Sequence, residues 1–365
     1  MKNDRNYNVD IIRIFAFFCV VAVHFFLMSG FYDISVGGKK MFIMSIFRNF
    51  FIICVPLFIT LTGYLMCNKV LKPGYYKRLF ELLLTYILCS IIYSIFKCLY
   101  YGDSFNFFEF LNCLLSYKGV SYAWYIEMYI GLFIMIPFLN LIFNNLNEKK
   151  DCQFLLASLL FIVSLPGMIN IYNVHSIEWW YHPSVSNDYF KVIPSWWINL
   201  YPLLYYFLGA YIRRFISSIK IKYGIILLLF TCFLSGIFSF YRSYGVSFAF
   251  ASWNDYSSLF TFILCALVFI LFLNIKISYK ITRLKKVLVV LSNACFGGFL
   301  LSCIFDQIFY EILAIKVPLV SDRFFYAPII VLCVFVCSLL SSIVVGFFQS
   351  HFIRICSKYL KKDSE

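Results

Sequence analysis

The chain has 365 residues, of which 62% are hydrophobic and only 13% are charged, and its mean hydropathy is +0.85. This composition excludes a soluble globular protein and predicts a polytopic membrane protein. The net charge of +14 would suit a nucleic-acid partner, but most Lys and Arg residues lie in one alternate set of loops between apolar stretches. That pattern predicts cytoplasmic termini, a multi-pass place in the cell membrane and no nucleic-acid partner.

Apolar stretches long enough to cross a bilayer recur along the chain. We expect about ten transmembrane helices, centred on residues 8–28, 43–66, 79–99, 122–143, 154–172, 198–212, 224–241, 257–275, 287–309 and 325–348. The first stretch lacks a small-residue cleavage site, so we expect a retained first span and no cleaved signal peptide. The sequence therefore predicts an all-α membrane helix bundle, formed by residues 1–365 as a single domain.

The first span, residues 8–28, is apolar but contains Asp10, Arg13 and His24. Ionisable groups in a membrane span are candidates for function. Arg13 and His24 are 11 residues apart, which places them roughly 20° apart around a helix and roughly 16 Å apart along it. Asp10 can pair with Arg13 at i, i+3. The alternative is that Arg13 reaches the lipid headgroups and His24 is an interior residue with satisfied hydrogen bonds.

The second span contains Arg48, Pro56 and Gly63. A short connection makes the first two spans antiparallel neighbours, so we expect Arg48 at about the depth of His24, where both could face one site. Pro56 and Gly63 predict a kink and a point of close helix packing.

The following inner loop, residues 68–78, carries Lys77 and Arg78. Its positive charge is explained by an orientation signal. It would also attract a polyphosphate from the cytosol to the mouth of the bundle near Arg13. Both interpretations stay open at the level of sequence.

Glu127 lies about one turn inside the fourth span, where a carboxyl group needs a partner or water. It could pair with Arg48, act as a second acid or base, or contact an acceptor.

All six tryptophans lie on the expected outer side, among them Trp124, Trp179 and Trp180. An aromatic belt populates both interfaces, whereas flat amphipathic rings on one side suit the apolar faces of sugars. We expect residues 173–197 to form an acceptor-recognition loop, with interfacial anchoring as the alternative.

The fourteen cysteines and four histidines do not indicate a metal site. Nearly all the cysteines lie in expected spans and no CxxC motif occurs, so we interpret them as packing residues. The histidines form no cluster with zinc-ligand spacing, and we predict no metal.

Several segments together resemble the acyltransferase 3 family of membrane enzymes. The first span matches a D-x-x-R-x(10)-H pattern through Asp10, Arg13 and His24, and the second matches R…VPLF…[ST]GY from Arg48 to Tyr64. The segment WYI at residues 124–126 resembles the entry to a central family helix, and FLGAYIRR at residues 207–214 resembles a later turn. Within the family, the chain looks most like the branch that acetylates cell-surface polysaccharides.

The chain departs from the family pattern in three places. Ser302 stands where many relatives have a histidine late in the ninth span, Glu127 is not expected at its position, and the basic pair Lys77 and Arg78 is an incomplete Arg-x-x-Arg motif.

The resemblance implies transfer of an acyl group, acetyl above all, from cytoplasmic acyl-coenzyme A to a hydroxyl of a surface glycan or its lipid-linked precursor. Coenzyme A would be a co-substrate rather than a bound cofactor, and proteins of polysaccharide assembly are candidate partners. The residues assigned are the following: His24, Arg48 and Glu127 for catalysis; Asp10, Arg13, Lys77 and Arg78 for the donor; and Trp124, Tyr125, Trp179 and Trp180 for the acceptor. Direct transfer and a covalent acyl-imidazole both stay open. The alternative function is a transporter or flippase of an envelope intermediate without acyl chemistry.

Overall fold

The structure is a computed structural model that describes residues 5–181, 189–216, 218–275 and 282–362. Within these ranges the chain folds into helices and contains no β-strand. The helices of the first half are α1 (Tyr7–Met28), α2 (Gly38–Phe51), α3 (Cys54–Met66), α4 (Lys77–Tyr101), α5 (Phe107–Leu115), α6 (Trp124–Asn145), α7 (Lys149–Val163), α8 (Pro166–Ile169) and α9 (Ile177–Tyr181). Those of the second half are η1 (Ile198–Leu200), α10 (Tyr201–Phe215), α11 (Ile221–Arg242), α12 (Leu259–Leu273), α13 (Thr282–Lys316), α14 (Val320–Arg323), η2 (Phe324–Tyr326) and α15 (Ala327–Lys362).

Within the described ranges, seven helical segments are long and apolar enough to cross a membrane, which confirms the all-α membrane bundle. The remaining three expected spans are occupied by α7, α10 and α12, which have 15 residues each. A helix of that length spans about 22 Å, less than a hydrocarbon core of about 30 Å. The total of ten crossings therefore stays a prediction.

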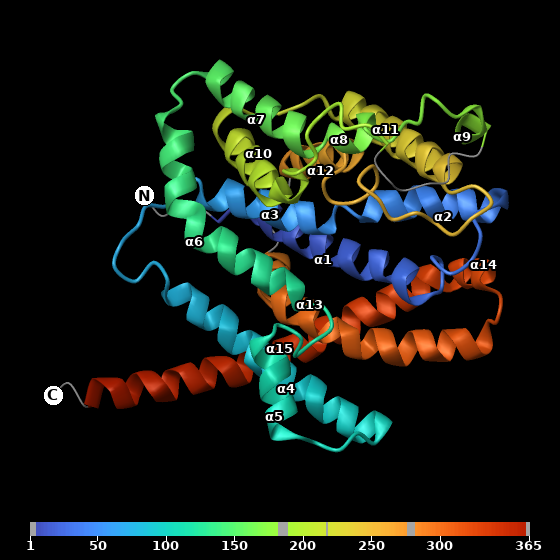
Figure 1. Cartoon of the computed structure of the whole chain (residues 1–365). Coiled ribbons are helices and arrows are strands. Elements are labelled where there is room, and N and C mark those ends of the chain that lie inside the picture. Colours follow the sequence, from blue (N-terminus) through green and yellow to red (C-terminus); the bar gives the residue numbers. More distant parts are fainter. Residues whose placement is uncertain (1–4, 182–188, 217, 276–281, 363–365) are drawn as a thin grey trace.

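Helix α1 packs against α3, α13 and α15, and so lies inside the bundle. Helix α10 packs on α3, α11 packs on α2 and α12, and α4 packs on α13 and α15. In Figure 1, α7, α10 and α11 lie on one side of α1, α4 and α5 lie on the other, and the start of α1 and the end of α15 lie at the same end of the bundle. That this end of the bundle faces the cytoplasm stays a prediction.

The second expected span is divided into α2 and α3 at Ile52 and Ile53. Pro56 is the cause, because a proline has no N–H to donate to the carbonyl of Ile52, four residues earlier, and its ring crowds that carbonyl. The Cys54 thiol lies 3.7 Å from the Ile52 carbonyl oxygen and takes the place of the missing donor. The predicted kink at Pro56 is therefore present as a break in the helix.

A second proline, Pro137, lies inside α6. It leaves the carbonyl of Phe133 without its helical donor. The Tyr75 hydroxyl donates to that carbonyl oxygen at 3.0 Å. The loop before α4 is thereby attached to α6.

Asn140, one turn further along α6, joins three segments. Its side-chain amide donates to the carbonyl oxygens of Met66 at 2.8 Å and Lys69 at 2.7 Å, and its Oδ1 accepts from the Tyr206 hydroxyl at 2.6 Å. Because Asn140 is buried, removing these partners would leave polar groups unsatisfied. The end of α3, the middle of α10 and α6 are therefore held in one arrangement.

Helices α3 and α10 cross at two glycines. A Cβ atom at Gly63 would lie 2.0 Å from the carbonyl oxygen of Tyr206, and one at Gly209 would lie 2.0 Å from that of Thr60. Small residues allow such close backbone approach between membrane helices. The crossing confirms the close packing predicted at Gly63 and fixes α3 relative to the rest of the bundle.

Gly209→Ala should destabilise the protein, because the added methyl group meets backbone that cannot move aside. We expect a loss of about 1–3 kcal/mol, seen as a lower midpoint of thermal unfolding of the detergent-solubilised protein. Gly131→Ala in α6 is the matched control, since a Cβ there meets nothing within 4 Å. Equal melting temperatures for the two variants would contradict the proposed role of the crossing.

Candidate functional site

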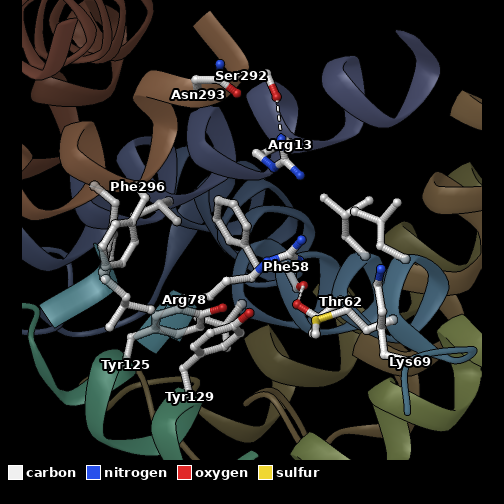
Figure 2. Close-up of a pocket in the computed structure, with 17 residues that line it drawn as sticks. Arg13, Phe58, Thr62, Lys69, Arg78, Tyr125, Tyr129, Ser292, Asn293 and Phe296 are labelled. Atoms are coloured by element: carbon white, nitrogen blue, oxygen red, sulfur yellow. Dashed lines mark hydrogen bonds between the residues drawn. The ribbon is translucent and has the colours of Figure 1, made fainter. Parts of the chain in front are cut away.

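A cavity of about 710 Å³ lies between α1, α3, α6, α13 and the start of α4. Figure 2 shows side chains of all five helices around this hollow. Its lining includes Arg13, Lys69 and Arg78, and no carboxylate appears among its described lining residues. Most of the remaining lining is apolar or aromatic. The cavity therefore combines a positively charged part with a long apolar wall.

Arg13 is held in this cavity by α13. Its Nη1 donates to the Ser292 hydroxyl at 2.6 Å, the contact marked in Figure 2. The expected pair with Asp10 is present at 3.8 Å, but Asp10 is bound more closely by Arg5, which donates to both carboxylate oxygens at 2.7 and 2.8 Å. Asp10 does not line the cavity. It therefore neutralises Arg13 only in part.

The two residues of the expected basic pair, Lys77 and Arg78, lie in different surroundings. Both residues begin α4, but only Arg78 lines the cavity, and the Lys77 side chain is exposed outside it. Lys69, in the turn after α3, takes the third basic position. The positive part of the cavity thus consists of Arg13, Lys69 and Arg78.

His24 forms a buried pair with Asp306 of α13. The His24 Nδ1 lies 3.2 Å from Asp306 Oδ2, and the Tyr122 hydroxyl donates to the same oxygen at 2.7 Å. The rings of His24 and Tyr122 pack with centroids 3.9 Å apart. Because an ionised carboxylate can only accept hydrogen bonds, the geometry assigns the proton of a neutral His24 to Nδ1. Its Nε2 is then a free base.

The pair lies just past the aromatic end of the cavity. Val20, one turn before His24, lines the cavity, as do Tyr125 and Phe299. The Tyr122 ring stacks on Phe299 with centroids 6.1 Å apart. The His24 side chain keeps 12% of its surface exposed, whereas Asp306 is fully buried. His24 itself is not among the residues that line the cavity, and the buried carboxylate can act only through the imidazole.

Arg48 is fully buried, and its hydrogen-bond partners lie in α2 and in the loops before α2 and α12, away from the cavity lining. Its Nε donates to the Tyr32 hydroxyl at 2.9 Å, and its Nη1 donates to the carbonyl oxygen of Asn254. Burial raises the pKa of the nearby Asp255 carboxyl, a shift that the Arg48 charge opposes. Glu127 is exposed, and no ion pair joins it to Arg48 within the described residues. The anticipated pairing of these two residues is not formed.

The aromatic residues expected at the acceptor lie in two places. Tyr125 lines the cavity, and Trp124 beside it is 39% exposed and stacks on Tyr256. Trp179 and Trp180 lie in α9, next to the end of α11 in Figure 1. Trp179 is buried and Trp180 is exposed. Residues 182–188 of the expected acceptor loop lie outside the described residues.

The sequence analysis did not identify Asp306, Tyr122 or Ser292 as site residues. A signal for Asp306 exists, because a lone carboxylate in an apolar span needs a partner and His24 is the histidine within an expected span. Ser292 and Tyr122 carry no comparable signal.

A family model described as an acyltransferase domain, that of the acyltransferase 3 family, matches residues 6–346. Comparisons with curated proteins and with solved structures gave no match. The matched range contains the cavity, Arg13, His24 and Asp306. The chain therefore belongs to the acyltransferase 3 family and is a membrane acyltransferase.

Proposed function

We propose that the protein transfers an acyl group, acetyl above all, from acyl-coenzyme A to a hydroxyl of a cell-surface glycan or its lipid-linked precursor. The observation that carries this proposal is one cavity with a basic part near Arg13 and an aromatic end near His24. The two residues are separated by roughly 16 Å along α1, which is comparable with an extended pantetheine arm.

The donor is proposed to enter through the basic part of the cavity. Guanidinium groups bind phosphates by paired, charge-assisted hydrogen bonds, and Arg13, Arg78 and Lys69 supply positive charge there. The apolar wall suits the pantetheine arm. The thioester then arrives near His24, while the nucleotide stays at the mouth.

The chemistry proposed at His24 is general-base catalysis. The Nε2 atom takes the proton of the acceptor hydroxyl as its oxygen attacks the thioester carbon. A C–O bond forms, the C–S bond breaks, and the imidazolium returns the proton to the leaving thiolate. Asp306 is a positioning residue, because it fixes the tautomer and stabilises the imidazolium. A covalent acyl-imidazole route would use the same nitrogen.

Arg48, Glu127 and Trp124 have other roles in this proposal. The contacts of Arg48 favour positioning of the outer loops rather than direct contact with the thioester. Glu127 and Trp124, both exposed at the start of α6, are proposed to contact the acceptor.

The function is tested by base-labile acyl esters on the envelope glycan of a deletion strain. Complementation with the wild-type gene should restore the ester. Normal ester levels in the deletion strain, or dependence on an ion gradient with no ester product, would favour the transporter alternative.

His24→Ala should lower the rate of acyl transfer by about 10²–10⁴-fold, measured as thiol release from acyl-coenzyme A by purified protein. Asp306→Asn should also lower the rate and change its pH profile, because the amide no longer selects the Nδ1–H tautomer. His351→Ala, at an exposed position near the end of α15, is the control and should keep wild-type activity. A fully active His24→Ala variant would refute the mechanism.

Arg78→Ala should raise the KM for acyl-coenzyme A about tenfold, the loss of one charge-assisted contact, with little change in kcat. Acyl-pantetheine, which lacks the nucleotide, should show the same KM with wild type and variant. Lys77→Ala is the matched control, since Lys77 lies outside the cavity. Equal KM effects on both donors would show that Arg78 does not bind phosphate.

A further inference from the structure

A second cavity, of about 350 Å³, lies at the far end of α4 from Arg78. Its walls are the end of α4, the loop 102–106, helix α5 and the loop that follows α5. Its charged lining residues are Lys97, Asp103, Glu109 and Lys118. Lys97 follows Arg78 by 19 residues on α4, so this cavity is about 28 Å along the helix from the basic mouth of the donor cavity.

A third cavity, of about 360 Å³, adjoins it and is apolar. Ile91, Ile95 and Leu99 form its wall on α4. It shares four lining residues with the polar cavity: Ser94, Cys98, Phe105 and Phe110. The two cavities thus form one bipartite site, polar on one side of α4 and apolar on the other.

Helix α5 has the features of a helix that lies at a membrane surface. It has no buried residue, and the exposed fractions of Phe107, Phe108 and Leu115 are 59%, 80% and 72%. A short helix with an exposed apolar face and a polar face lies in the interface of a bilayer. In that position of α5, the apolar part of the site would face the lipid chains.

Hydrogen bonds and close packing fix the backbone of the loop after α5. The Tyr86 hydroxyl donates to the Leu114 carbonyl oxygen at 3.0 Å and accepts from the Gly119 N–H at 3.1 Å. A Cβ atom at Gly119 would lie 2.5 Å from the Ser90 hydroxyl oxygen. Tyr117 has φ 53°, a left-handed conformation that costs about 1–3 kcal/mol in a non-glycine residue. Lys118 is therefore held in place rather than on a free loop.

Hydrogen bonds join the wall of the polar cavity to the segments that carry Tyr122 and Asp306. Tyr93 lines the cavity, and its hydroxyl accepts from Gln307 Nε2 at 2.8 Å and lies 3.3 Å from the Ser121 hydroxyl. Ser121 and Gln307 directly adjoin Tyr122 and Asp306 in sequence. The wall of the polar cavity thus lies beside the residues that hold His24.

We propose that this bipartite site binds the acceptor, and that the acceptor is a saccharide joined through phosphate to a long apolar chain. The inference rests on the proposed function and specifies its acceptor. Lys97 and Lys118 would bind the phosphate, Asp103 and Glu109 would accept hydrogen bonds from sugar hydroxyls, and the apolar cavity would hold the start of the chain. The acceptor thus reaches His24 from α4 and α5, and the donor from the opposite end of the bundle.

Binding is tested without any acyl transfer. The probe is a radiolabelled, photoreactive disaccharide linked through diphosphate to an isoprenoid chain, added to the full-length protein in nanodiscs. We expect cross-links within residues 91–119, abolished by unlabelled probe but not by the free disaccharide. Combined Lys97→Glu and Lys118→Glu should reduce labelling at least tenfold, whereas Lys316→Glu, outside both cavities, should not. Labelling that is unaffected by the double substitution would overturn the proposal.

The acceptor role is tested by kinetics. With the lipid-linked disaccharide, the double variant should show at least a tenfold higher KM for the acceptor, and Ile95→Trp, which fills the apolar cavity, should do the same. Leu332→Trp, on the exposed surface of α15, is the matched control. Hydrolysis of acyl-coenzyme A without acceptor should stay at the wild-type rate in all variants.

Different results would contradict the acceptor site and the proposed acyltransferase function. Equal acylation of the lipid-free and the lipid-linked saccharide, without cross-links in residues 91–119, would overturn the acceptor site and leave the acyltransferase. Specific cross-links without transfer to either acceptor would overturn the proposed function and leave a lipid-linked saccharide site.

Discussion

A polar or charged group inside a bilayer must find a partner, because there is no water to solvate it. The bundle meets this constraint by joining helices that are far apart in sequence. Asp306 of α13 accepts hydrogen bonds from His24 and Tyr122, and Ser292 of the same helix holds Arg13. The residues that form the candidate site are therefore also among those that position α1 on α13.

The backbone obeys the same constraint. Prolines in α3 and α6 each leave a carbonyl without its helical donor, and the Cys54 thiol and the Tyr75 hydroxyl occupy the two positions. Asn140 then ties α6 to α3 and α10. These contacts fix the turn that carries Lys69 and the start of α4. The hydrogen bonds that satisfy backbone carbonyls therefore also position the basic part of the cavity.

The two proposed substrates have opposite physical requirements, and the bundle separates them. A soluble polyphosphate is attracted by a cavity whose described lining has positive but no negative side chains. A membrane-bound amphiphile needs mixed charge beside an apolar surface, which the α4 and α5 region supplies. In the proposed mechanism both routes end at His24, whose imidazole is partly exposed while its carboxylate partner is buried.

The sequence alone determined the all-α membrane bundle, the family, and the common face of Arg13 and His24, because hydropathy and helical spacing are local properties. It also indicated the break at Pro56 and the close contact at Gly63. Only the tertiary structure decided that Asp306 holds His24 and that Arg48 contacts the loops before α2 and α12. Such pairings join residues hundreds of positions apart, and no periodicity along the chain encodes which helix lies opposite which.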